Sequence, residues 1–213
     1  MRAALLTLLA VASPLAAQDA ATALRRAERT YGGITTLTAE FTQTLVNPML
    51  GGPEESQGVL YLVPPDRFAM RFIHPEGDRI VADGTWLWAY APSSVPDQVI
   101  RQPVPRSGTA SPNLVSQFVD NPLERYTARY VGTDTIGGET VDVVHLTPRR
   151  DDLPFREAEI AVARSDGLLR RIAVREPSGQ RRTFIFRRIR TNVPIPDAEL
   201  RFDVPAGVRV VVP

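Results

Sequence analysis

The fold is decided by residues 58–90, where two extended runs read Gly58-Val59-Leu60-Tyr61-Leu62-Val63-Pro64-Pro65-Asp66-Arg67-Phe68-Ala69-Met70-Arg71-Phe72 and Asp83-Gly84-Thr85-Trp86-Leu87-Trp88-Ala89-Tyr90. Successive side chains of a strand point to opposite faces of its sheet. Phe68, Met70 and Phe72 therefore share one face, while Arg67 and Arg71 share the other. We predict that the three apolar side chains point into the molecule.

The second run follows a hairpin-type turn at Asp83-Gly84 and places Trp86, Trp88 and Tyr90 on one face. Two structures fit these aromatic-rich strands. One is the core of a β-sandwich, and the other is a concave sheet whose apolar face receives a hydrophobic ligand. Periodicity does not separate them, because both bury the same side chains.

The first seventeen residues have the pattern of a secretory signal. Met1-Arg2 is a short positive region, an apolar stretch follows, and small residues lead up to Ala17. Pro14 interrupts the stretch well short of the roughly 20 apolar residues that span a bilayer. We therefore expect residues 1–17 to be removed and the mature protein, 18–213, to be exported and soluble in the periplasm.

Composition excludes several classes of function. The chain has no cysteine, which rules out disulfides, thiolate metal sites, cysteine nucleophiles and lipid attachment at an N-terminal cysteine. It carries 25 basic and 24 acidic residues, and removal of the signal takes away Arg2 alone. A balanced charge gives no indication of a nucleic-acid partner.

The rest of the chain predicts a mainly β (α+β) fold in one domain. A helix is expected over 19–31, with Asp19 as N-cap and an apolar stripe of Ala20, Leu24, Ala27 and Tyr31. Further strands are expected near residues 37–42, 98–101, 125–130, 140–147, 157–164, 168–175, 181–190, 199–204 and 208–212. The total is about ten or eleven strands, joined by short turns into an antiparallel meander.

Residues 92–112 are rich in proline and predict a mobile loop. Ser111-Pro112 then reads as an N-cap followed by proline at the first helical position. The short helix that follows, to about Asp120, carries Leu114 and Phe118 on its apolar face. It is either a movable lid or a helix packed permanently on the sheet.

No constellation of side chains indicates catalysis or a metal site. His74 and His145 are the only histidines, and they stand in no metal-ligand spacing. No nucleophile elbow, phosphate loop or dinucleotide fingerprint occurs. Residues 156–190 hold ten arginines against four acids, which fits a solvated sheet face or a basic rim for an acidic partner or a lipid headgroup.

Several short motifs together resemble one known family. In chain order they are Phe41-Thr42-Gln43, Gly58-x-Leu60-Tyr61-Leu62, Pro65-x-x-Phe68, Asp83-Gly84-x-x-Leu87-Trp88-x-Tyr90, Asp166-Gly167-x-Leu169-x-x-Ile172, Gly179-Gln180 and Phe202-x-x-Pro205-x-Gly207-Val208. Each is weak by itself. In this order, after a signal peptide, they resemble LolA, the periplasmic lipoprotein carriers, over nearly the whole mature chain.

The resemblance implies an unclosed antiparallel β-barrel with a helical lid over an apolar cavity that holds lipoprotein acyl chains. Such carriers take cargo from an inner-membrane ABC transporter and deliver it to an outer-membrane receptor, with no covalent chemistry and no cofactor. We expect a monomer. The side chains expected to line the cavity are Leu24, Tyr31, Phe41, Leu60, Leu62, Phe68, Met70, Phe72, Trp86, Trp88, Tyr90, Leu114 and Phe118. We also expect Phe68 to lie near the cavity mouth, within reach of water.

The sequence departs from the family at one position. Well-known members carry an arginine directly before the proline of the second strand, and this arginine latches the lid; here the position is Pro64. Arg67 and Arg71 are the candidates to replace it. Two other functions remain open: a periplasmic protein of the same fold that binds another lipid or senses envelope stress, and an exported hydrolase, which lacks a nucleophile–base pair.

Overall fold

A computed structural model of the chain describes residues 14–49, 51–104 and 113–213. The strands are β1 Leu37–Val46, β2 Glu54–Val63, β3 Arg67–His74, β4 Arg79–Asp83, β5 Trp86–Tyr90, β6 Gln98–Pro103, β7 Tyr126–Ile136, β8 Glu139–Pro148, β9 Glu157–Ala163, β10 Leu169–Arg175, β11 Arg181–Thr191 and β12 Arg209–Val211. The helices are α1 Pro14–Gly32, α2 Ser116–Val119 and α3 Pro122–Arg125, with a 3-10 turn, η1, at Asp197–Leu200. No helix among the described residues is long and apolar enough to cross a membrane.

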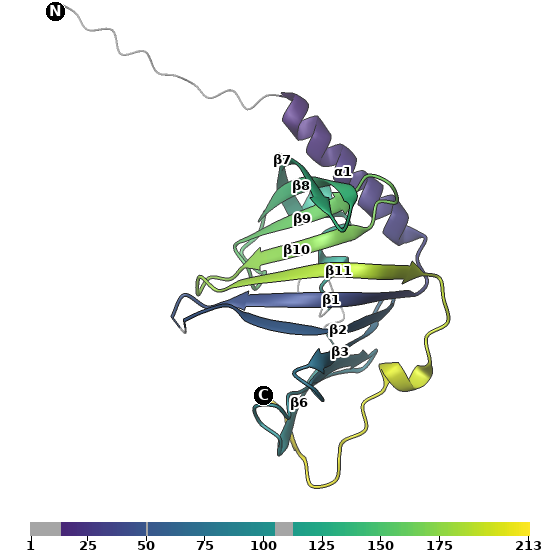
Figure 1. Cartoon of the computed structure of the whole chain (residues 1–213), viewed down its shortest axis with the longest axis vertical. Helices are drawn as coiled ribbons and strands as arrows, with labels where there is room; N and C mark the ends of the chain where they lie inside the picture. The colour runs from purple at the N-terminus through teal and green to yellow at the C-terminus, as the bar shows by residue number, and fades with distance from the viewer. Residues whose placement is uncertain (1–13, 50, 105–112) are drawn as a thin grey trace, which may run out of the picture.

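All the strands belong to one curved sheet in the order β12-β6-β5-β4-β3-β2-β1-β11-β10-β9-β8-β7 (Figure 1). It consists of two antiparallel meanders, β1–β6 and β7–β11, which are joined where β1 pairs with β11. The edge strands β7 and β12 do not pair with each other, so the sheet is not closed. The prediction of an unclosed, mainly β fold with a helical lid is confirmed.

Three details of the predicted meander are wrong. The described residues form twelve strands, where about ten or eleven were expected, and one of them, β4, lies where no strand was predicted. Pairing is not antiparallel throughout, since β12 lies parallel to β6. Residues 199–204 do not form a strand: η1 occupies the first two of them, and the rest have no regular secondary structure.

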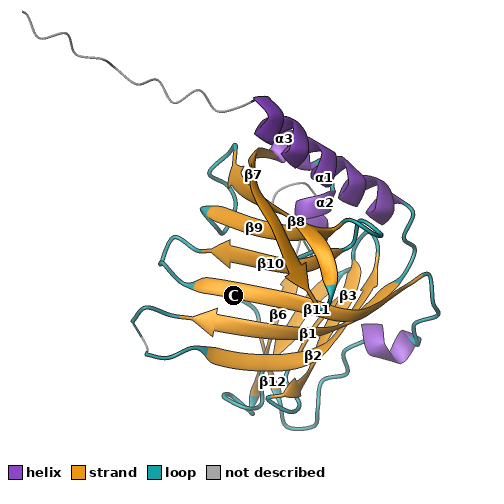
Figure 2. Ribbon diagram, turned by 45° about the horizontal axis from the view of Figure 1, so that its top comes forward, coloured by secondary structure: helices purple, strands orange, loops and turns teal. Residues whose placement is uncertain are grey.

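Helix α1 covers one end of the sheet and contacts β7, β8 and β9 (Figure 2). The predicted stripe is buried at Ala20, Leu24 and Ala27, and Tyr31 is half-buried. The helix begins at Pro14, so Asp19 lies inside it and is not its N-cap. Alanine and leucine favour helix, and nothing in residues 15–18 stops α1 from extending toward the chain start.

Gly167 permits the close approach of α1 to the turn between β9 and β10. This residue has a φ of +76°, and a Cβ atom there would lie 2.4 Å from the Thr30 hydroxyl of α1. That hydroxyl donates a hydrogen bond to the Asp166 carbonyl at 2.8 Å. The predicted Asp166-Gly167 turn is therefore also a docking point for the helix.

The sheet has an apolar layer on each face, and we call the face under the helices the inner face. The inner layer is the larger one and includes residues of α1, α2 and most strands. On the outer face a smaller cluster forms beneath the C-terminal segment, where Phe202 stacks on Trp88 with ring centroids 5.3 Å apart. Two layers on opposite faces mean that a strand such as β5 is apolar on both sides.

Candidate functional site

The inner face gathers most of the side chains that the sequence predicts for a cavity. The strand residues alternate as expected, so Phe68 and Met70 are buried in the inner layer while Arg67 and Arg71 are exposed on the other side. Ten predicted residues lie in this layer or pack against it: Leu24, Tyr31, Phe41, Leu60, Leu62, Phe68, Met70, Phe72, Leu114 and Phe118. Their role in binding a ligand stays a prediction.

A glycine allows one aromatic side chain to lie flat against the sheet. A Cβ atom on Gly58 would lie 2.2 Å from the Arg71 carbonyl oxygen and 2.8 Å from the Phe41 ring. Without that atom, the Phe41 ring reaches Phe72, and the two meet edge to face with centroids 5.2 Å apart. The glycine of the Gly58-x-Leu60 motif is thus required by inner-face packing.

The inner face encloses a pocket of about 290 Å³, which we call the inner pocket. Its wall is mostly apolar, and a smaller polar part is formed by Gln117, Glu176 and Arg182. The apolar lining residues are Phe68, Met70, Ile80, Leu87, Leu114, Pro154, Phe155, Val174 and Phe184. Glu176 and Arg182 form an ion pair at 3.5 Å, and they mark the polar side of the pocket next to the β10–β11 turn.

Helix α2 borders the inner pocket and is held in place by an aromatic cluster. Phe118 is fully buried, and its ring centroid lies 5.9 Å from that of Tyr126 and 5.5 Å from that of Phe155. The Tyr126 hydroxyl donates to the Gln117 carbonyl at 2.9 Å. Burial raises the pKa of Tyr126 to about 12, so the hydroxyl stays a donor even in alkaline solution. The cluster fixes α2 to β7 and to the loop before β9.

The described part of the predicted lid helix is short. It spans Ser116–Val119, and just before it the Asn113 side-chain oxygen accepts a hydrogen bond from the Val115 amide at 3.1 Å. The predicted N-cap and first position, Ser111 and Pro112, lie outside the described residues. A four-residue helix has little stability of its own, so its position depends on the aromatic cluster.

A carboxylate near the end of the sheet fastens α1. Asp142 of β8 forms ion pairs with Arg26 of α1 and with Arg164, the latter at 2.7 Å. Tyr130 adds a hydroxyl donor at 3.0 Å. Burial opposes ionisation of this carboxyl, but the hydrogen bonds from Arg164, Arg26 and Tyr130 outweigh it and hold the pKa of Asp142 below its ordinary value. Asp142 thus connects three segments of the chain.

Asp142→Asn is expected to lower the free energy of unfolding by about 2 kcal/mol at neutral pH. The estimate is below the cost of breaking a fully buried pair because half of the Arg164 side chain is exposed. An ionised carboxylate with a lowered pKa stabilises the fold above its ordinary pKa of about 3.9, and the contribution is lost as pH falls through the lowered value. Urea unfolding at several pH values measures both effects.

The matched control for this substitution is Asp134→Asn. Asp134 forms an exposed ion pair with Arg171 at 2.9 Å, and its loss should change stability much less. Wild type should lose stability more steeply than Asp142→Asn as the pH is lowered below about 4. Parallel pH profiles for these two proteins would show that Asp142 does not fasten α1 as an ionised group.

Three predicted cavity residues lie on the wrong face. Trp86, Trp88 and Tyr90 belong to the outer cluster, where Phe202 stacks on Trp88 and meets Tyr90 edge to face with centroids 5.8 Å apart. Leu87 alternates with them and lies on the inner face. The prediction assigned the larger aromatic side chains to the interior. The C-terminal segment covers them from outside instead.

The inner pocket also contains residues that the sequence pattern does not predict for it. Ile80, Leu87, Phe155, Val174 and Phe184 all line it. Alternation along β5 places Leu87 on the opposite face from Trp86 and Trp88, but it does not show which of the two faces points inward. Phe155 lies in a loop, where no periodicity exists to reveal burial.

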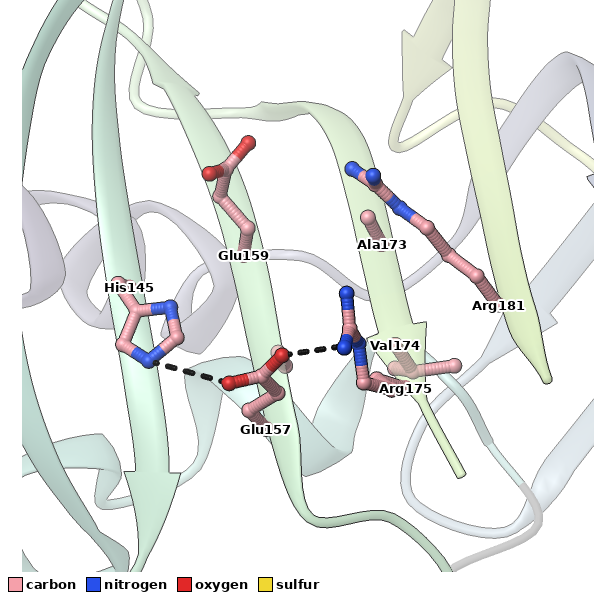
Figure 3. A pocket seen from close by; sticks show the side chains of 8 residues that line it. His145, Glu157, Glu159, Ala173, Val174, Arg175 and Arg181 are labelled. Carbon is pink, nitrogen blue, oxygen red and sulfur yellow. Dashed lines mark ion pairs between the residues drawn. The ribbon is translucent and has the colours of Figure 1, made fainter. Parts of the chain in front are cut away.

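The arginine-rich run of residues 156–190 is largely paired. Six of its ten arginines form ion pairs: Arg164, Arg170, Arg171, Arg175, Arg182 and Arg188. A second group of these side chains lines an outer pocket of about 200 Å³. In it Glu157 lies between His145, 3.8 Å away, and Arg175, 3.0 Å away (Figure 3). Within the described ranges, no group of three or more His, Asp or Glu side chains is placed to hold a metal ion.

Comparison with known proteins decides the family. The model of the family described as outer membrane lipoprotein carrier protein LolA matches residues 32–203. The chain belongs to the LolA family. An outer-membrane lipoprotein carrier protein of Chromobacterium violaceum is 29% identical over 208 residues, which are 97% of this chain and 96% of that protein. The outer-membrane lipoprotein carrier protein of Halorhodospira halophila is 31% identical over 206 residues, which are 96% of this chain and 93% of that protein.

Solved structures with the LolA-like fold are similar at lower identity. An uncharacterized conserved protein from Thermus thermophilus has a TM-score of 0.58 at 16% identity, with 92% of this chain and 100% of that chain covered. The crystal structure of MucB has a TM-score of 0.52 at 19% identity, with 91% of this chain and 66% of that chain covered. Both show that the fold is shared.

This LolA-family chain lacks an arginine latch at the expected place. Pro64 and Pro65 line a second pocket of about 240 Å³ between the end of α1, the end of β2 and α2. The predicted replacements do not reach it: Arg71 pairs with Glu199 at 3.0 Å and Arg67 lies 4.0 Å from Asp197, both on the outer face. Arg67 and Arg71 are four residues apart on one strand, so both side chains point to the outer face and away from the second pocket. The lid is held by the Phe118 cluster instead.

Proposed function

We propose that this protein carries lipoproteins by shielding their acyl chains in the inner pocket. The observation that supports the proposal is an apolar pocket on the concave face, bordered by a short helix. Each methylene group moved out of water contributes about 0.8 kcal/mol, so acyl chains cross an aqueous compartment only when covered. Met70 in the wall adapts to chains of different shape.

The inner pocket must widen to hold such cargo. Its volume of about 290 Å³ lies at the lower limit of ordinary ligand sites, which measure about 300–1,000 Å³. Movement of α2 would join it to the second pocket, because Ser116 and Val119 of α2 line the second and Gln117 lines the first. Opening requires separation of Phe118 from Tyr126 and Phe155, so cargo binding is expected to compete with this aromatic cluster.

The proposed cycle takes cargo from an inner-membrane ABC transporter and gives it to an outer-membrane receptor. The family and the names of the relatives support this route. The carrier would act as a monomer, without catalysis, cofactor or nucleic acid. The affinity of the carrier for acyl chains must be moderate, since cargo bound too tightly would not be released to the receptor.

Export is part of the same proposal. Residues 1–17 would be removed, and 18–213 would form a single carrier domain in the periplasm. Ala17 is the proposed cleavage position because small residues precede it. N-terminal sequencing of the protein recovered from the periplasmic fraction measures the cut directly.

A pair of adjacent positions tests the carrier function. A photo-crosslinking residue at Leu87 is expected to capture the acyl chains of a lipoprotein, because Leu87 lines the inner pocket. The same residue at Trp86 should not, because Trp86 packs on the outer face. Both positions are half-buried, so exposure does not bias the comparison. Capture at neither position, or equally at both, would contradict the assignment of the inner pocket.

The second candidate is a periplasmic protein of the same fold that binds a different lipid or senses envelope stress. It is supported by the shared fold with MucB, which is less specific than the family match. Mass spectrometry of apolar material extracted from the purified protein separates the two. Acylated peptides favour the carrier, and a free lipid alone favours the second candidate.

A further inference from the structure

The hairpin between β1 and β2 ends in an exposed apolar tip. Val46 is 40% exposed and Met49 is 87% exposed. No charged residue occurs from Thr44 to Pro53. Met49 at the end of this hairpin is therefore almost entirely exposed, and its side chain is available to another surface.

A cationic side chain lies directly beside this tip. Val46 pairs with Arg181 across the β1–β11 ladder. Arg181 is exposed and forms no ion pair with any described residue, and Figure 3 shows its guanidinium apart from the paired Glu157 and Arg175. Apolar side chains next to an unpaired cation form the pattern of segments that rest in the headgroup region of a bilayer.

The tip and the inner pocket occupy the same end of the sheet. Figures 1 and 2 both show the β1–β2 hairpin beside the β10–β11 turn. A Cβ atom on Gly179 of that turn would lie 3.5 Å from Pro48 of the hairpin. Arg182, which lines the inner pocket, pairs with Leu45. The polar side of the pocket is therefore one residue along the ladder from the tip.

We propose that the tip, formed by Val46, Pro48 and Met49, inserts into the surface of a lipid bilayer while Arg181 binds a lipid phosphate. This contact would place the inner pocket against the membrane that gives or receives the acyl chains. The link to cargo rests on the proposed carrier function, whereas the membrane contact itself does not.

Size and charge favour a bilayer over a protein partner. A stable protein interface buries about 800 Å² on each side, which two exposed side chains on a hairpin tip do not supply. Insertion into a bilayer needs no such area; it requires an apolar tip that protrudes beyond the neighbouring turns. Glu54 and Glu55 follow the tip at the base of β2 and are exposed, so they limit insertion to the tip itself.

The test uses the chain's lack of cysteine. Met49→Cys, labelled with an environment-sensitive fluorophore, is added to vesicles of phosphatidylcholine with a minority of phosphatidylglycerol, and to vesicles of phosphatidylcholine alone. Emission should rise and shift to the blue with the mixed vesicles, and less with the neutral ones. Labelled Val131→Cys, at an exposed apolar position of edge strand β7, should not respond.

Flotation of unlabelled protein gives the affinity. Val46→Ser combined with Met49→Ser is expected to weaken binding to the mixed vesicles about tenfold, which corresponds to about 1.4 kcal/mol. Arg181→Gln should weaken binding by a smaller factor and reduce its dependence on salt. Unchanged affinity of the double variant, or no vesicle binding by wild type, would overturn the proposal, as would self-association through the tip in place of vesicle binding.

Crosslinking of lipoprotein at Leu87 separates this inference from the carrier function. The double variant should capture cargo as wild type does, because neither substituted side chain lines the inner pocket. Vesicle binding by a protein that captures no cargo would reject the carrier function and keep the membrane contact. Capture of cargo by a protein that does not bind vesicles would reject the membrane contact and keep the carrier function.

Discussion

Phe68→Glu is expected to destabilise the protein by about 5 kcal/mol or more, enough to unfold a domain of ordinary stability. Phe68 is only 3% exposed and belongs to the inner layer. Removing its ring costs about 3–5 kcal/mol in packing, and an unpaired carboxylate in the same place adds several more. The sequence predicts Phe68 at the rim of a cavity, where a carboxylate reaches water, and the burial of this side chain contradicts that prediction. Thermal and urea unfolding measure the loss.

Two variants of the same strand serve as controls. Ile73→Glu changes an apolar β3 side chain that is 65% exposed, and it should leave the unfolding midpoint nearly unchanged. Phe68→Met keeps the site apolar and should cost about 1–2 kcal/mol. A folded Phe68→Glu variant with a midpoint close to wild type would mean that the inner pocket is wide and hydrated at this position.

Phe118→Ala is expected to lower stability by about 3–4 kcal/mol and, at the same time, to raise the affinity for an apolar fluorescent dye several-fold. The loss follows because Phe118 is fully buried between Tyr126 and Phe155. The gain follows because this cluster is what holds α2 over the inner pocket. A ligand that binds only the open form binds more tightly when the closed form becomes less stable relative to the open one. Dye titration below the unfolding midpoint measures the affinity.

Leu200→Ala is the matched control for this second prediction. Leu200 is buried in the outer cluster, away from α2, and its truncation should cost about 2–5 kcal/mol. If the lid explanation is right, dye affinity rises in Phe118→Ala alone. An equal rise in both variants would show that general loosening of the fold, and not release of α2, admits the dye.

The two substitutions separate two functions of one apolar layer. In the proposed carrier cycle, Phe68 belongs to the wall that must persist when cargo is bound, and Phe118 belongs to the part that must move away. Both are fully or almost fully buried, so burial alone does not distinguish wall from lid. The distinction comes from attachment: β3 is hydrogen-bonded to a strand on each side, whereas α2 is a four-residue helix held by side chains.

Local sequence determined the elements and the faces of most strands. Alternation of Phe68 and Met70 with Arg67 and Arg71 fixes which side of β3 is wet, because charged side chains cannot be buried unpaired. The stripe on α1 was likewise readable, since one apolar face at helical spacing has one way to be buried. Turn residues such as Asp166-Gly167 marked where hairpins reverse.

Only the tertiary structure decided the orientation of β5 and the contacts that hold the lid, because the sequence pattern is compatible with more than one answer. Strand β5 is apolar on both faces, so its sequence is compatible with either orientation; it is the C-terminal segment, carrying Phe202 past Trp88, that makes the tryptophan face the outer one. In the same way, Pro64 excluded the family's latch, yet only the three-dimensional meeting of Phe118, Tyr126 and Phe155 shows what holds the lid. Contacts between residues far apart in the chain leave no periodic trace in sequence, because neither partner's local spacing depends on the other.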